Sequence, residues 1–200
     1  MIQDVIEGVL SSGLRAIVVR DLDVETWDGV RAWLEGELER RHWITYPGPV
    51  ASNPRVVGFD VSKGTVSTRI AVVSVGLPEE TFLGAEYRVT QYSMDDYMLR
   101  LAREEGLYSR VSELVELPHA KAMEKLSRTV DLLVENGIPI RHSKRLLHLL
   151  RGLAGFRASP AAFADRFLEE AVALLGPSGL RDRFLPLVGD LADAFALLER

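Results

Sequence analysis

Four consecutive segments with a helical spacing of apolar residues occupy the last two-fifths of the chain, at about 119–136, 142–154, 159–175 and 181–199. Apolar side chains recur there at intervals of three and four residues, as they do in a helix with one buried face. Asn136-Gly137 ends the first segment and Ser159-Pro160 begins the third, because glycine ends helices readily and proline suits the first helical turn. We therefore expect this part of the chain to be almost entirely helical.

The region before these helices is rich in strand-like runs. Three apolar runs have the composition of strands: 55–61, 68–77 and 82–91. Short turns join them, at Lys63-Gly64 and at Pro78-Glu79-Glu80, and short links indicate antiparallel neighbours. Ser93 is a suitable N-cap for a helix through Glu105. A fourth strand at 111–117, whose spacing also permits a helix, and a short fifth strand at 138–140 complete a mixed α/β sheet.

The N-terminal region predicts an α-β-α module. Residues 2–11 have the pattern of a short helix, 14–20 of a buried strand and 24–41 of an amphipathic helix. The segment 45–54, TYPGPVASNP, contains three prolines and a glycine and is typical of a linker or long loop. We therefore predict an N-terminal module at 1–46, a Pro/Gly linker at 47–54 and a core with C-terminal helices at 55–200.

Composition limits the classes of protein to consider. The chain has 200 residues, 47% of them apolar, which is enough for one substantial core. It contains no cysteine, so disulfides and thiolate metal sites are excluded. The opening residues have no basic region, and no apolar run approaches bilayer length, so we expect a cytoplasmic protein without a membrane partner. Two asparagines, two glutamines and 26% charged residues suit a thermophile.

Four acidic residues stand at positions where carboxylates can converge. Asp60 ends the first strand of the central block in VVGFDVSKG, and Glu116 ends the fourth in SELVELPHA, with Glu113 as an equal competitor. Asp190 and Asp193 lie three residues apart in the last helix, in GDLADAFALL. A spacing of three places the last two on neighbouring positions of one helical face.

These stretches resemble the RuvC-type Holliday-junction resolvases, which belong to the RNase H-like nuclease superfamily, over about residues 55–198. In that family a strand ending in Gly-hydrophobic-Asp, a later strand ending in Glu and a terminal helix with Asp-x-x-Asp-Ala supply the metal ligands. The predicted order, three antiparallel strands followed by β/α units, is that of an RNase H-like fold. The chain departs from the family in carrying about 54 residues before its first catalytic strand.

The resemblance implies a Mg²⁺- or Mn²⁺-dependent endonuclease acting on DNA, branched or junction DNA in particular. Two such ions about 4 Å apart activate water and stabilise the leaving oxygen, and they require hard oxygen ligands from several elements. Asp60 would bridge the ions, Glu116 would hold one, and Asp190 or Asp193 would complete the other. A homodimer is implied as well, since a two-fold junction needs paired sites.

A basic segment supplies a candidate nucleic-acid surface. From Arg141 to Arg157 there are five basic residues, two histidines and no acid. Lys144, His148 and Arg151 share one face of the predicted helix, opposite its leucines, and Arg145 adjoins them. We predict that these four residues contact a phosphate backbone.

Simpler explanations stay open for each of these residues. Asp60 precedes a turn whose amides it can bond, and the other acids can belong to solvated faces. Gly137 invites a helix-turn-helix interpretation, but Asn136 and Ser143 stand where apolar residues are needed. No glycine-rich nucleotide loop, zinc-binding histidine spacing or Gly-x-Ser-x-Gly motif is present in the sequence.

The alternative function is a noncatalytic interaction or adaptor protein. Its helical C-terminal half would present an apolar groove to a protein partner, and the acids would only increase solubility. The two hypotheses differ in one geometric requirement. A nuclease needs Asp60, Glu116 and one of the last-helix acids within metal-bridging distance, whereas an interaction protein does not.

Overall fold

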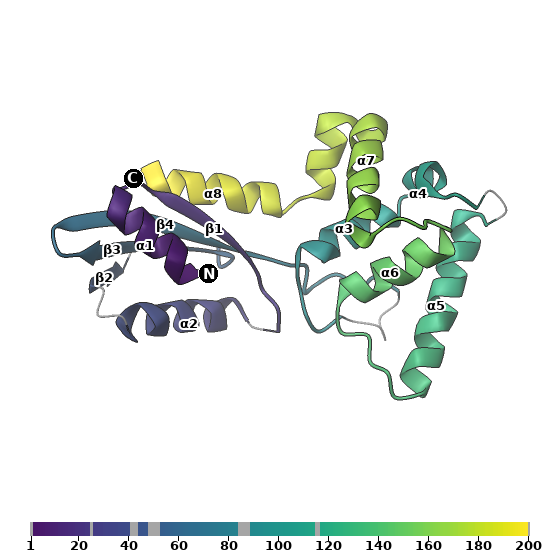
Figure 1. The fold of residues 1–200 in the computed structure, drawn as a ribbon, viewed down its shortest axis with the longest axis horizontal. Coiled ribbons are helices and arrows are strands. Elements are labelled where there is room, and N and C mark those ends of the chain that lie inside the picture. The colour runs from purple at the N-terminus through teal and green to yellow at the C-terminus, as the bar shows by residue number, and fades with distance from the viewer. Residues whose placement is uncertain are drawn as a thin grey trace. The chain divides into compact units, whose positions relative to one another are not determined.

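The computed structural model describes residues 2–24, 26–40, 44–47, 53–83, 89–114 and 117–199. It shows a mixed α/β protein that is mostly helical (Figure 1). The chain divides into two compact units: unit 1 comprises Met1–Val75 and Pro186–Arg200, and unit 2 comprises Gly76–Leu185. Among the described residues, no helix combines the length and the apolar character that crossing a bilayer requires.

Unit 1 contains a four-stranded mixed sheet with the order β1-β4-β3-β2. Its strands are β1 (Ala16–Asp21), β2 (Ile44–Pro47), β3 (Val56–Lys63) and β4 (Val66–Val75). Its helices are α1 (Ile2–Ser12), α2 (Trp27–Arg40) and α8 (Leu187–Glu199). Strands β2, β3 and β4 pair antiparallel, and β1 pairs parallel with β4.

The core of unit 1 lies between this sheet and its helices. Apolar β-branched residues fill the second half of β4, where every residue from Ile70 to Val75 is buried. Such residues pack well on a pleated surface, which explains why this run forms the central strand. Helices α1 and α8 contact β3 and β4, and α2 contacts β2. Figure 1 shows α2 and α8 on opposite sides of the sheet.

Unit 2 is a helical unit. Its helices are α3 (Met94–Ala102), α4 (Glu105–Val111), α5 (His119–Glu135), α6 (Ser143–Leu153) and α7 (Pro160–Arg183). Helix α3 packs against α6 and α7, α4 against α5 and α7, and α5 against α6. Within α7, Gly176 departs from helical geometry with a φ of 64°, so the predicted helix end near 175 corresponds to a kink.

Apart from α4, the helices lie close to their predicted bounds, but the strands predicted for unit 2 are not found in its described residues. The prediction of a strand at 111–117 is wrong at its start, because Val111 ends α4 and shares that helix's buried face with Leu107 and Tyr108. No strand forms at 138–140 within the described residues. Of the predicted strand at 82–91, residues 84–88 lie outside the described part. Its end makes only an isolated bridge between Gln91 and His142.

The predicted division at 47–54 differs from the observed units. β1 belongs to the predicted N-terminal module, yet it pairs with β4 from Ala16↔Ile70 to Asp21↔Val75. β2 overlaps the TYPGPVASNP segment and pairs with β3. Pairing between strands far apart in sequence leaves no local pattern. The prediction therefore placed the domain boundary at the Pro/Gly segment 47–54, which is the strongest local turn signal.

Candidate functional site

Asp60 is bound by an arginine on the neighbouring strand. The register of the β3–β4 hairpin places it opposite Arg69. Arg69 Nε donates to Asp60 Oδ1 at 2.6 Å, and Nη2 donates to Oδ2 at 3.0 Å. The hydrogen bond to Asp60 raises the pKa of the Arg69 guanidinium above its ordinary value. Both carboxylate oxygens of Asp60 therefore already have a cationic partner, in the bidentate geometry that arginine favours.

Asp190 and Asp193 are brought together by an asparagine. Asn53 Nδ2 donates to Asp190 Oδ1 at 2.6 Å and to Asp193 Oδ2 at 3.0 Å. Asp190 lies in the first turn of α8 and is 2% exposed. Burial raises the pKa of the Asp190 carboxyl above its ordinary value, and Asp193 raises it further, while Asn53 and the charge of Arg55 lower it.

The structure does not bring Asp60 to this pair. Arg69, which holds Asp60, also donates to Leu197 O at 3.3 Å, seven residues along α8 from Asp190. Seven residues correspond to about 10 Å of helix rise. Among the described residues, no three His, Asp or Glu side chains form a group that could hold a metal ion. Glu116 lies outside the described residues. The described acids therefore do not fit the convergent carboxylates that two Mg²⁺ or Mn²⁺ ions require.

The four predicted nucleic-acid contacts lie on α6, but two of them are tied to backbone carbonyls. Arg145 Nη1 donates to Pro139 O at 3.1 Å, and Arg151 Nη1 donates to Ala158 O at 2.6 Å. Lys144 and His148 are exposed, and neither forms a hydrogen bond or ion pair with another described residue. These two side chains border the cavity described next.

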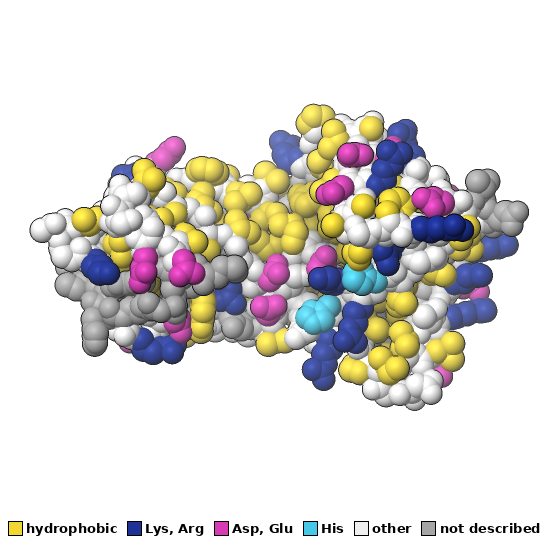
Figure 2. Space-filling model, viewed as in Figure 1, with side chains coloured by type: hydrophobic (Ala, Val, Ile, Leu, Met, Phe, Trp, Pro, Cys, Tyr) yellow, Lys and Arg dark blue, Asp and Glu magenta, His cyan; other side chains and the backbone are white. Residues whose placement is uncertain are grey.

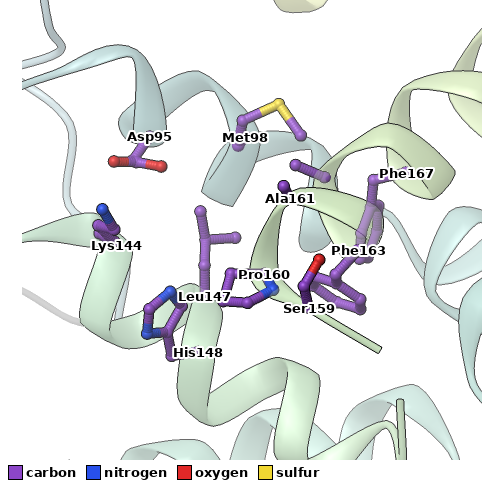
Figure 3. A pocket seen from close by; sticks show the side chains of 11 residues that line it. Asp95, Met98, Lys144, Leu147, His148, Ser159, Pro160, Ala161, Phe163 and Phe167 are labelled. Carbon is purple, nitrogen blue, oxygen red and sulfur yellow. The ribbon is translucent and has the colours of Figure 1, made fainter. Parts of the chain in front are cut away.

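A pocket of about 540 Å³ opens to solvent within unit 2 (Figure 3). Its walls come from α3, α6 and the first turns of α7. Seven apolar residues line it: Met98, Leu147, Pro160, Ala161, Phe163, Ala164 and Phe167. Four polar residues stand around them: Asp95, Lys144, His148 and Ser159. An apolar cavity of this size with few polar groups is typical of a binding site.

Aromatic packing fixes the floor of the pocket. Phe163 and Phe167 meet edge to face, with ring centroids 4.6 Å apart and an interplanar angle of 79°. Phe156 packs against Phe163 in a similar arrangement at 5.2 Å. Such pairs contribute about 0.5–1.5 kcal/mol beyond the area they bury. The pocket is therefore lined by side chains that packing already holds in place.

The polar groups of the pocket include a serine and a histidine that are not paired with each other in the described structure. Ser159 is the N-cap of α7, and its Oγ accepts a hydrogen bond from Ala162 N at 3.2 Å. No hydrogen bond joins Ser159 to His148 in the described structure, so a nucleophile paired with a base is not assembled there.

No protein-family model, curated protein or solved structure matches this chain. The interpretation of the pocket therefore depends on its own geometry.

A buried carboxylate joins the two walls of the pocket. Asp96 Oδ2 accepts from Leu77 N at 2.9 Å and Ser93 N at 3.0 Å, and Oδ1 accepts from the Ser143 hydroxyl. Asp96 and Ser143 are both fully buried. Burial raises the pKa of Asp96 above its ordinary value, and Asp95 raises it further, while the three hydrogen bonds lower it. Asp96 thereby holds the start of α6 against the start of α3.

Sequence reasoning missed both this clamp and the pocket. Ser93 was predicted as an N-cap and is confirmed as one, and the acid three residues later completes a capping box. That spacing was a readable signal for Asp96. Phe163 and Phe167, four residues apart after the Ser159-Pro160 helix start, were a readable signal for one apolar face. Nothing local indicated that this face would meet α3 and α6.

Proposed function

We propose that this chain is a noncatalytic protein-interaction protein, and that unit 2 binds a segment of a partner protein in its apolar pocket. The observation that carries the proposal is the solvent-open cavity of about 540 Å³ with a floor of packed phenylalanines. Its wall residues are well packed and ordered by the Asp96 clamp, so a partner would meet a preformed surface.

The chemistry of the cavity suits an apolar anchor residue. Met98, Leu147 and Phe163 line the cavity, and all three side chains are already buried, so the cavity has a dry apolar wall. Fully burying one leucine or phenylalanine side chain contributes about 1.5–3 kcal/mol. A pocket that takes one such side chain, with additional contacts on its rim, gives the moderate affinity of an adaptor.

The geometry gives less support to a metal-dependent nuclease. Asp60 is held by Arg69, and Asp190 is buried and held by Asn53. An RNase H-like core over 55–200 would pair β4 with the third predicted strand, 82–91, whereas the second neighbour of β4 is the parallel strand β1. The RNase H-like fold, the action on DNA and the homodimer stay predictions. Cleavage of labelled junction DNA with Mg²⁺ or Mn²⁺, lost in Asp60→Asn, would establish a metal-dependent nuclease and its substrate class.

A peptide selection tests the proposed function. A displayed library of helix-forming and extended peptides, each about 16 residues long, would be selected on the full chain. We expect enriched peptides whose affinity falls at least about tenfold on Ala161→Glu, which places a charge at the pocket opening. Glutamate in the first turn of a helix is otherwise favourable, so the fold should be preserved.

A matched control lies on the same helix. Ala173→Glu makes the same chemical change at an exposed position of α7 that does not line the pocket. Its affinity for the selected peptides should equal that of the wild type. A selection that enriches no peptide, or only peptides that ignore Ala161→Glu, would show that the pocket does not bind a partner segment.

A further inference from the structure

The apolar lining of the pocket continues along an exposed stripe of α7. Ala161 and Ala164 line the pocket, and Leu168 and Val172 follow at intervals of four residues. Leu168 is 37% exposed and Val172 is 52% exposed. From Ala161 to Val172 the helix rises about 16 Å, or three turns. The pocket is therefore one end of a longer apolar track.

The α6 side of the pocket has a single sign of charge. Arg141, Lys144, Arg145 and His148 are all exposed there, and Lys144 and His148 also border the cavity. No acid occurs between residues 141 and 157. Figure 2 shows Lys, Arg and His side chains gathered over α6. In Figure 3, Lys144 and His148 lie on α6 beside the apolar lining, and Asp95 lies on the α3 side.

We propose that the segment bound by this pocket is an acidic amphipathic helix of a partner protein, an inference that rests on the proposed function. One apolar residue of that helix enters the pocket, and residues one and two turns away cover Leu168 and Val172. Its acidic flank faces Lys144 and His148. This arrangement is the helix-in-groove mode, in which anchors recur at i, i+3 or i+4, and i+7.

The structure favours a helical occupant over an extended one. Extended peptides commonly add to an exposed sheet edge, and the described part of unit 2 contains no strand longer than an isolated bridge. A helix, in contrast, matches both the length and the straightness of the track on α7. Asp95 on the α3 wall and the exposed Asp165 on α7 repel acids of the partner, so the acidic flank of its helix is directed to Lys144 and His148 on the α6 wall.

The test uses two designed helical peptides, each about 16 residues long. Both carry leucine along one face. One has glutamate on the flanks, and the other has lysine at the same positions. Fluorescence anisotropy with the full chain should give saturable binding of the glutamate peptide, at least about tenfold tighter than the lysine peptide. Each exposed pair of opposite charges changes the affinity only a few-fold, so a tenfold ratio requires several such pairs between the peptide and the chain.

Methionine methyl NMR locates the binding. The chain contains four methionines, and Met98 lines the pocket while Met123 lies on α5 outside it. The glutamate peptide should shift the Met98 methyl signal and leave that of Met123 unchanged. Met98→Leu, which conserves volume, identifies the signal.

Four variants test the charge arrangement and the track. Lys144→Gln should weaken the glutamate peptide about threefold, and Asp95→Asn should strengthen it by a similar factor, with both signs reversed for the lysine peptide. Leu168→Ser should weaken both peptides. Lys125→Gln, an exposed position on α5, should change neither.

The outcomes separate this inference from the proposed function. Equal binding of both peptides, with the Met98 shift retained, would overturn the acidic partner and leave a pocket that binds helices. Absence of any Met98 shift would overturn the helical partner, and the peptide selection would then decide whether the pocket binds any segment. Self-association of the free chain that Leu168→Ser abolishes would assign the track to a second copy instead.

Discussion

Replacing Asp96 by asparagine or by alanine should have very different effects on the stability of unit 2. The carboxylate accepts hydrogen bonds from the backbone N–H groups of Leu77 and Ser93 and from the Ser143 hydroxyl. In Asp96→Asn, the amide oxygen can accept both N–H groups and the amide NH₂ can donate to the serine oxygen. Both N–H groups stay paired and only the Ser143 hydroxyl proton must turn to another acceptor, so we expect a change within about 1 kcal/mol in the free energy of unfolding.

Alanine leaves those donors without an acceptor. Each unsatisfied buried donor costs about 1–3 kcal/mol, and the hydroxyl can rotate toward another acceptor, so two N–H groups set the scale. We therefore expect Asp96→Ala to lower the free energy of unfolding by about 2–6 kcal/mol. Because burial raises the pKa of the wild-type carboxyl, the charge itself contributes little that asparagine would lose.

The assay must follow unit 2 separately. All three tryptophans, Trp27, Trp33 and Trp43, occur in the segment 1–75, so their fluorescence reports on unit 1. Far-ultraviolet circular dichroism in urea reports mainly on the helices of unit 2, and the two probes together show whether the units unfold in separate transitions. An Asp96→Asn variant as unstable as Asp96→Ala would refute the reasoning, because the ionised carboxylate rather than donor pairing would then be required.

Three further predictions concern stability in other parts of the chain. Burial raises the pKa of Asp190 in the folded state, so the native protein holds that proton more tightly than the unfolded chain. The stability of the wild type relative to Asp190→Asn should therefore rise as the pH falls from neutral toward the ordinary aspartate pKa, and level off below it. A stability difference that stays constant with pH in urea titrations would contradict the burial argument. Gly155→Ala should destabilise by at least about 1–2 kcal/mol in the same urea assay, because its φ of 74° is left-handed and an added Cβ would lie 2.6 Å from Leu114 Cγ. Gly152→Ala, in open space on α6, should instead stabilise by about 0.5–1 kcal/mol. Asp60→Asn, which leaves its arginine partner without a carboxylate, should lower the thermal midpoint by an amount equivalent to about 1 kcal/mol, and an unchanged midpoint would show that the ion pair contributes nothing.

The sequence was sufficient for the elements whose signals are local. The end of α5 was predicted within one residue, because Gly137 adopts the left-handed conformation, with a φ of 76°, that terminates a helix. Ser93 was identified as a cap for the same kind of reason, since a side-chain acceptor satisfies free N–H groups of the first turn. Apolar periodicity gave the remaining helices, apart from α4.

Such local signals did not predict which β-strands pair with each other, with one exception. The turn at Gly64 pairs Lys63 with Val66, and that register alone places Asp60 opposite Arg69. The ion pair was thus predictable from the hairpin once its turn was fixed. The parallel pairing of β1 with β4 was not, because it joins two segments far apart in the sequence and leaves no pattern within either of them.

The division of the chain has a consequence for its synthesis. Unit 1 is discontinuous, since Met1–Val75 requires α8, whose Ala194, Leu197 and Leu198 are buried, whereas unit 2 is one uninterrupted segment. Domains usually fold in the order in which they leave the ribosome. Here Met1–Val75 is translated before unit 2, but its apolar surface stays uncovered until α8 has been translated. Unit 2 can fold before then, so chaperone recognition of the nascent chain should concentrate on Met1–Val75.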